Sequence, residues 1–253
     1  MLGAIAGDVI GSPYEHAPIK SKDFNLFNRY SVFTDDTVLS LAVAWSLLEN
    51  IPYQKTLREF FQQYPNAGYG GRFRRWARSP MPKAYGSFGN GSAMRVSPIA
   101  WFYDDLDKVI EEALHSAEAT HNHPEGIKGA QAVAVAIFTA RHGADKSRIK
   151  SVIEDRFGYD LSLSLDQIRP EYRFEVSCQN SVPQGIVSFL ESTDFEDAVR
   201  NAVSLGGDSD TLACIAGAIA EAYYGGVPDD IAEQTLSRLD ERLKSVYLTF
   251  QGR

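Results

Sequence analysis

The chain has 253 residues, of which 44% are hydrophobic and 23% are charged, so it lies in the range of ordinary globular proteins and can bury a sizeable core. Its formal net charge of −8 argues against sequence-independent binding to nucleic acid, because the field of the protein repels polyanions. An anionic ligand would therefore need a local pocket.

Helical periodicity dominates the chain. Apolar residues recur three and four positions apart in six segments, at residues 37–48, 106–117, 129–140, 183–190, 210–224 and 231–248. The best alternating segment, residues 173–177, is too short to organise a sheet, and residues 157–182 are expected to form a long surface loop. The sequence therefore predicts an all-α fold in which residues 1–253 form a single compact domain of about ten helices.

The first helix is expected to carry Gly7 and Gly11, whose spacing of four lets another helix approach closely. Pro13 is expected to end this helix, which places Glu15 just beyond it. In that position Glu15 is either a surface acid or a catalytic carboxylate, and spacing alone leaves both open.

Two helix starts are acidic: Thr34-Asp35-Asp36-Thr37 and Asp208-Ser209-Asp210-Thr211. Capping and the helix dipole alone would favour acids there. The helix after the second motif, however, is apolar on every side, so its start is predicted to be buried, where an unpaired charge costs several times the roughly 1 kcal/mol of a cap. Neither motif contains Lys or Arg. Carboxylates and hydroxyls are hard oxygen ligands, so the pattern predicts a site for Mg²⁺ or Mn²⁺ rather than Zn²⁺.

Three further segments are ambiguous. Residues 72–78 combine four arginines with two aromatics, which we interpret as a solvated helix face with its aromatics packed inward rather than as a nucleic-acid surface. The glycine-rich residues 86–95 either cradle a phosphate with backbone N–H groups or form a plain turn. His121 and His123 either orient a ligand or cap the helix expected near Pro124.

The cellular location is expected to be the cytoplasm. Cys178 and Cys214 lack the spacing of a disulfide framework or a zinc ribbon, which is typical of a reducing compartment. The first residues contain no basic segment of the kind that opens a secretory signal. The longest apolar stretch, residues 212–220, is far shorter than the roughly 20 residues that a membrane span requires, so no membrane partner is expected.

Five motifs together resemble the ADP-ribosylglycohydrolase family, which includes the dinitrogenase reductase-activating glycohydrolase. They occur in order along nearly the whole chain, at residues 7–15, 33–37, 89–95, 120–121 and 206–211. The resemblance implies an all-α enzyme with two Mg²⁺ or Mn²⁺ ions. It would hydrolyse the glycosidic bond between ADP-ribose and an acceptor, which is a protein side chain or a small molecule, and release ADP-ribose.

The resemblance also implies roles for individual residues. The metal ligands would be Thr34, Asp35, Asp36, Asp208, Asp210 and Thr211. The diphosphate and ribose would be held by Gly89, Asn90, Gly91, Ser92, Met94 and His121. Catalysis would involve Glu15, Asp35 and Asp210, with Glu15 near the anomeric carbon and Asp210 bridging the ions. Two alternatives remain: a di-metal phosphohydrolase acting on nucleotides, and a catalytically silent member used for binding or as a structural protein.

Overall fold

The computed structural model describes residues 1–253 and confirms the all-α prediction, because it contains fifteen helices and a single isolated β-bridge. Of the helices that the predicted segments did not include, three have four to six residues and three have ten to twelve. In chain order the helices are α1 (Leu2–Glu15), α2 (Asp35–Glu49), α3 (Tyr53–Gln63), α4 (Gly71–Arg78), α5 (Gly91–Met94), α6 (Ser97–Phe102), α7 (Leu106–Glu118), α8 (Pro124–Arg141), α9 (Lys146–Phe157), α10 (Leu165–Ile168), α11 (Cys178–Leu190), α12 (Phe195–Ser204), α13 (Ser209–Tyr224), α14 (Asp229–Ser237) and α15 (Glu241–Gln251).

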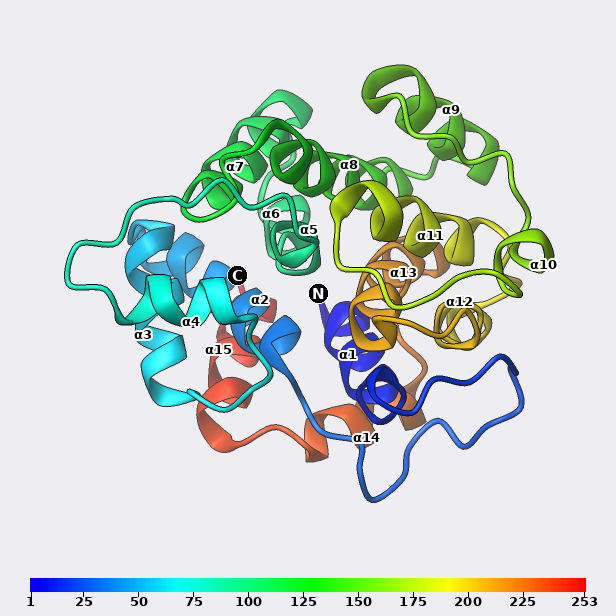
Figure 1. The fold of residues 1–253 in the computed structure, drawn as a ribbon, viewed down its shortest axis with the longest axis horizontal. Coiled ribbons are helices and arrows are strands. Elements are labelled where there is room, and N and C mark those ends of the chain that lie inside the picture. The colour runs from blue at the N-terminus through cyan, green and yellow to red at the C-terminus, as the bar shows by residue number, and fades with distance from the viewer.

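Helices α1 and α13 lie side by side near the centre of the molecule (Figure 1) and form its most extensive helix pair. Glycines make this approach possible, as predicted. A Cβ atom on Gly7 would lie 2.0 Å from the carbonyl oxygen of Ala213, and one on Gly11 would lie 2.5 Å from that of Ser209. The two backbones are therefore in direct contact, and the middle of α1 lies against the first turn of α13.

Helix α13 is buried from Ser209 to Glu221, as expected for a helix that is apolar on all sides. It packs against α1, α8, α11 and α12. Its start is also buried, since Asp208 and Asp210 are only 7% and 4% exposed. The prediction that acidic side chains lie inside the protein at this helix end is thus confirmed.

The end of α1 differs from the prediction, because Pro13 lies inside the helix and Glu15 is its last residue. A proline cannot donate a backbone hydrogen bond to the carbonyl four residues earlier. Here the hydroxyl of Ser12 donates to the Val9 carbonyl oxygen instead, at 3.1 Å. The last turn can therefore continue through the proline.

Two other boundaries were predicted wrongly. The expected surface loop at residues 157–182 contains α10 and the first turn of α11, which passes through Pro183 instead of starting there. The single helix expected at residues 231–248 is two helices, α14 and α15. The break has a local cause, because the Asp240 side chain accepts a hydrogen bond from Leu243 N at 2.9 Å and caps a new helix.

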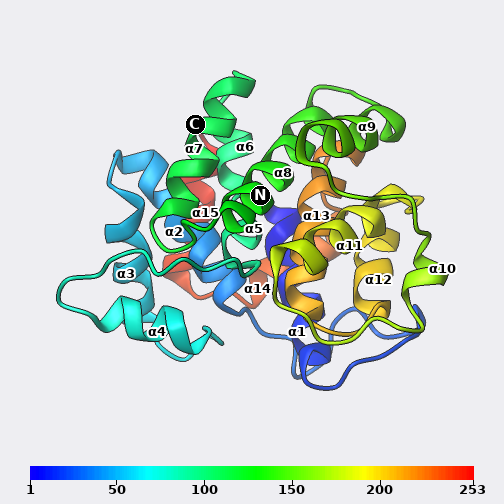
Figure 2. The same cartoon turned by 45° about the horizontal axis from the view of Figure 1, so that its top comes forward.

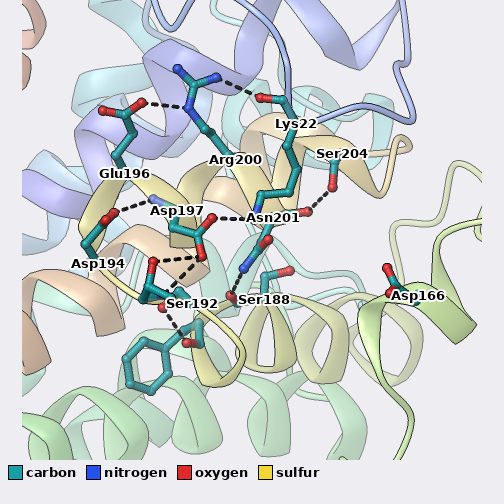
Figure 3. A network of polar contacts seen from close by, with 12 residues as sticks. Lys22, Asp166, Ser188, Ser192, Asp194, Glu196, Asp197, Arg200, Asn201 and Ser204 are labelled. Atoms are coloured by element: carbon teal, nitrogen blue, oxygen red, sulfur yellow. Dashed lines mark hydrogen bonds and ion pairs between the residues drawn. The ribbon is translucent and has the colours of Figure 1, made fainter.

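The long connection between α1 and α2 is fixed to α12 by a polar network (Figure 3). Arg200 of α12 donates to the carbonyl oxygens of Lys22 and Phe24, at 2.8 and 2.7 Å, and is held in place by Glu196. The ammonium group of Lys22 in turn pairs with Asp197. These contacts hold the chain that leads into the first acidic helix start.

Two groups of helices flank the central pair (Figure 2). Helices α3 and α4 lie on one side, and α9 to α12 lie on the other. No helix combines the length and the apolar composition needed to span a lipid bilayer.

Candidate active site

A cavity of about 440 Å³ opens where α1, α2, α4, α5 and α13 converge. Both acidic helix starts border it, as does the glycine-rich segment. An extended strap that precedes α11 also borders it, through Phe174 and Val176. The end of α1 contributes Glu15 to its lining, and the acidic motifs contribute Asp35, Asp36, Asp208, Asp210 and Thr211. Residues from both ends of the sequence therefore share one cavity.

The carboxylates form two overlapping triads. Oxygen atoms of Asp8, Asp36 and Asp210 lie within 4.8 Å of one another, and so do those of Glu15, Asp208 and Asp210. Asp210 belongs to both triads and is therefore the point at which they join. Each triad has the spacing expected of side chains that share one cation.

Asp8 is a member of this cluster that the sequence analysis missed. It is fully buried in α1 and accepts hydrogen bonds from the backbone and hydroxyl groups of Thr34 and Thr37. The bonds from Thr34 N and Oγ1 measure 2.9 and 2.7 Å. Asp8 thus holds the start of α2 against α1. The available signal was an acidic residue in a segment that is otherwise apolar on every side.

The charges of this cluster are not neutralised by basic side chains. No Lys, Arg or His nitrogen lies within 4.0 Å of its aspartates, and Glu15 has only the exposed His16, at 3.6 Å. Burial raises the pKa of Asp8 to about 6. Burial, and then the neighbouring carboxylates, also raise the pKa values of Asp36 and Asp210 well above the ordinary range.

The donor set fits a hard divalent cation. Asp36 is 2% exposed, and its Oδ1 atom has no hydrogen-bond partner. Its other oxygen accepts from Thr211 Oγ1 at 3.2 Å. A buried carboxylate oxygen without a donor is costly unless a cation contacts it, and oxygen ligands of this kind suit Mg²⁺ and Mn²⁺.

The unneutralised cluster gives a prediction for the metal-free protein. Because burial and the charge of Asp8 raise the pKa of Asp36, the folded state keeps a proton that the unfolded chain has lost above the ordinary aspartate range. Stability therefore falls as pH rises toward the raised pKa. With a chelator present, the free energy of unfolding of Asp36→Asn should exceed that of the native protein by about 1–3 kcal/mol at pH 8. Near pH 4.5 the two free energies should be equal.

Urea unfolding with a chelator and with excess Mg²⁺ measures this effect. In Mg²⁺ the order of stability should reverse at pH 8, because only the native protein gains the full free energy of metal binding. The same ordering with and without Mg²⁺ would show that Asp36 is not part of a metal site.

The glycine-rich segment has two backbone N–H groups without an acceptor. Gly89 N donates to Ser87 Oγ at 3.2 Å, and Asn90 N donates to the Val176 carbonyl oxygen at 2.7 Å. Gly91 and Ser92 begin α5, so their N–H groups have no partner within that helix, and no other protein acceptor binds them. Gly91 lines the cavity, so its N–H group remains available to an anionic ligand there.

Two side chains connect this segment to the rest of the site. Asn90 Nδ2 donates to Asp208 Oδ2 at 2.7 Å, which ties the glycine segment to the acidic cluster. His121 lines the cavity, and its Nε2 atom would lie 3.2 Å from a Cβ atom on Gly91. Burial, with Arg95 and Arg72 nearby, lowers the pKa of His121 well below the ordinary range, so its ring is neutral at pH 7.

The structure does not bring every predicted side chain to the cavity. Gly89, Asn90, Gly91, Met94 and His121 line it. The Ser92 side chain does not, because its hydroxyl donates to the Gly126 carbonyl oxygen at 2.7 Å, and the Thr34 hydroxyl binds Asp8. The cavity also has lining residues that were not predicted, among them Arg72, Phe73, Tyr85, Phe174 and Val176.

The fold and the cavity together define an all-α protein with a buried carboxylate site of the kind that holds divalent cations. The sequence model of the ADP-ribosylglycohydrolase family matches residues 1–251. The chain belongs to the ADP-ribosylglycohydrolase family, as its motifs indicated.

Similarity to known proteins, in sequence and in structure, supports this assignment. The chain is 28% identical to the ADP-ribosylhydrolase ARH3 of Xenopus tropicalis, over 89% of this chain and 86% of that protein. It is 24% identical to the ADP-ribosylarginine hydrolase Tri1 of Pseudomonas putida, over 92% and 72%. A solved structure of an ADP-ribosylglycohydrolase-related protein complex matches the fold with a TM-score of 0.74 at 26% identity, covering 98% of this chain and 95% of that one.

Proposed function

We propose that this protein hydrolyses the glycosidic bond between ADP-ribose and an acceptor, with two Mg²⁺ or Mn²⁺ ions as cofactors. One observation carries the proposal: a single cavity is lined both by a carboxylate cluster without basic partners and by Gly91, whose backbone N–H group has no acceptor. The buried carboxylate cluster requires cations, and the free N–H group suits a phosphate. ADP-ribose has a diphosphate that this N–H group would bind and ribose hydroxyls that cations can contact.

The proposed metal ligands are the oxygen atoms at the two acidic helix starts, from Asp35, Asp36, Asp208, Asp210 and Thr211. Thr34, which the sequence suggested as a ligand, is more directly placed to orient Asp8, because its hydroxyl donates to Asp8 Oδ1. Bound ions would supply Lewis-acid stabilisation and fix the sugar hydroxyls.

The chain's own groups would complete the reaction. Gly91 would hold the diphosphate through its backbone N–H group, with the neutral His121 ring beside it. Glu15 is partly exposed to the cavity, and burial and the nearby Asp208 raise its pKa. Its carboxylate would take the proton of the attacking water as the bond between the anomeric carbon and the acceptor breaks, and would pass that proton to the departing acceptor. The surrounding carboxylates would stabilise positive charge at the anomeric carbon.

Product analysis tests the function. The protein, loaded with Mg²⁺ or Mn²⁺, is incubated with peptides that carry ADP-ribose on arginine or on serine. Release of free ADP-ribose with an intact diphosphate supports the proposal, whereas release of phosphate would identify a phosphohydrolase. A silent family member would release neither.

ADP-ribose should also bind far more tightly than ribose. The variant Gly91→Val should bind ADP-ribose more weakly than the native protein, because the added side chain would meet the His121 ring.

Glu15→Gln gives a separate prediction for the catalytic step. The variant keeps the shape of the side chain and should bind Mg²⁺ and ADP-ribose nearly normally, but its single-turnover rate should fall by about 10²-fold or more. Calorimetry and single-turnover kinetics on this one variant distinguish the possible roles. Loss of metal affinity along with rate would make Glu15 a metal ligand, and no loss at all would make it a surface acid.

A further inference from the structure

The exposed face of α4 carries positive charge that no acidic side chain of the protein neutralises. Arg74, Arg75 and Arg78 have no carboxylate oxygen within 4.0 Å. The Nε atom of Arg74 is buried and has no hydrogen-bond partner. In a chain with a net charge of −8, three unpaired arginines on one helix of eight residues form a local basic surface.

This surface adjoins the mouth of the active-site cavity. The three arginines, with Gly71 and Ser79, line an open groove of about 610 Å³, which we call the α4 groove. Gly71 lines both the α4 groove and the cavity. A molecule that leaves the cavity past Gly71 therefore meets the arginines directly.

The geometry favours an acidic peptide over a nucleic acid. The aromatic residues of α4, Phe73 and Trp76, are only 6% and 4% exposed, as expected for an inward-packed face, so the α4 groove offers no platform for stacking bases. A helix of eight residues is also only about 12 Å long, which is short for tracking a phosphate backbone. A few carboxylates in a short segment match its size and charge.

We propose that the α4 groove binds acidic side chains that flank the ADP-ribosylated residue of a protein acceptor. This inference rests on the proposed function and adds to it a substrate class, namely proteins modified within acidic segments. Arginine guanidinium groups suit the role because they bind carboxylates in a bidentate manner.

Two peptides with the same ADP-ribosylated residue, one flanked by Asp and Glu and the other by Ser and Gln, test the proposal. The native protein should show a kcat/KM about 5- to 10-fold higher on the acidic peptide, and this preference should decrease at high salt. The double variant Arg75→Glu/Arg78→Glu should lose the preference but keep its rate on an ADP-ribosylated free amino acid.

The matched control is Arg148→Glu/Arg156→Glu, which makes the same change in net charge on exposed residues of α9, on the opposite side of the molecule (Figure 2). It should retain the preference. The proposal would be overturned if the native protein showed the same kcat/KM on both peptides. It would also be overturned if the α9 control lost the preference for the acidic peptide as fully as the α4 double variant does.

Direct binding separates this proposal from the proposed function. Fluorescence anisotropy follows an unmodified acidic peptide as the native protein and the α4 double variant are titrated into it. If no peptide is hydrolysed but the acidic peptide binds through α4, the proposed function fails and the α4 groove stands. If a short single-stranded oligonucleotide binds through α4 and the acidic peptide does not, the groove is a nucleic-acid surface and the proposal is wrong.

Discussion

Asp210→Ala is expected to abolish both the metal response and the hydrolysis of ADP-ribosylated substrates. Asp210 is the only residue common to both carboxylate triads, so its loss removes an oxygen ligand from each. Removing a residue that only hydrogen-bonds to a metal ligand typically lowers metal affinity or activity by about 10- to 100-fold. Because Asp210 is itself a proposed ligand, the turnover of this variant should fall by at least about 10²-fold. The native protein should lose activity and thermal stability in chelator and regain both with Mg²⁺ or Mn²⁺, whereas Asp210→Ala should regain neither.

Asp107→Ala is the matched control, because Asp107 occupies the same second position of its helix, α7, but is exposed and unpaired. This variant should recover with metal as the native protein does. Thermal unfolding and activity are measured on all three proteins before and after chelation. If Asp210→Ala recovered with Mg²⁺ as well as Asp107→Ala does, the shared-ligand assignment would be wrong.

Gly7→Ala is expected to have the largest effect on stability. In most helices this change is favourable by up to about 1 kcal/mol, because alanine has the higher helix propensity. Here the new Cβ atom would lie 2.0 Å from the Ala213 carbonyl oxygen and 2.3 Å from its carbonyl carbon, and both are backbone atoms that cannot rotate away. Helices α1 and α13 must separate, which should cost about 3 kcal/mol or more.

Gly71→Ala provides the comparison for stability. Gly71 is the first residue of α4, and a Cβ atom on it would meet nothing within 4 Å. This variant should unfold at the same urea concentration as the native protein or a higher one, whereas Gly7→Ala should unfold at a much lower concentration. Similar midpoints for the two variants would contradict the direct backbone contact.

The sequence was informative where one local pattern determined the structure. The boundaries of α2 and α13 were predicted within two residues, because acidic first turns precede long apolar segments. The same first turns supplied most of the acidic side chains that line the cavity. A helix start fixes the direction of its first side chains, so two such starts that meet in the core bring their acids together.

Other features depended on contacts between distant segments. The role of Asp8 becomes apparent only when α2 lies against α1, since its four hydrogen bonds all come from Thr34 and Thr37. The strap around Val176 reaches the cavity by pairing with Asn90, which is 86 positions away. Single-sequence periodicity contains no information about either pairing.

Side-chain hydrogen bonds explain the misplaced helix ends. Pro13 was predicted to end its helix. The Ser12 hydroxyl, however, donates a hydrogen bond to the Val9 carbonyl oxygen, to which the proline cannot donate. Asp240 had the opposite effect, since its capping bond to Leu243 N starts a new helix within an apolar pattern that is otherwise continuous. Both cases show a polar side chain overriding the backbone preference of its neighbours.

The direct contact between α1 and α13 also has a consequence for synthesis on the ribosome. Helix α1 ends at residue 15 and its partner begins at residue 209. At typical elongation rates of 5–20 residues per second, α1 is complete for roughly 10 to 40 s before α13 has been made. Throughout that interval an almost entirely apolar segment, which includes Asp8, lacks the helix that buries it. Nascent chains of this protein should therefore need protection of their first residues until the final quarter of the chain emerges.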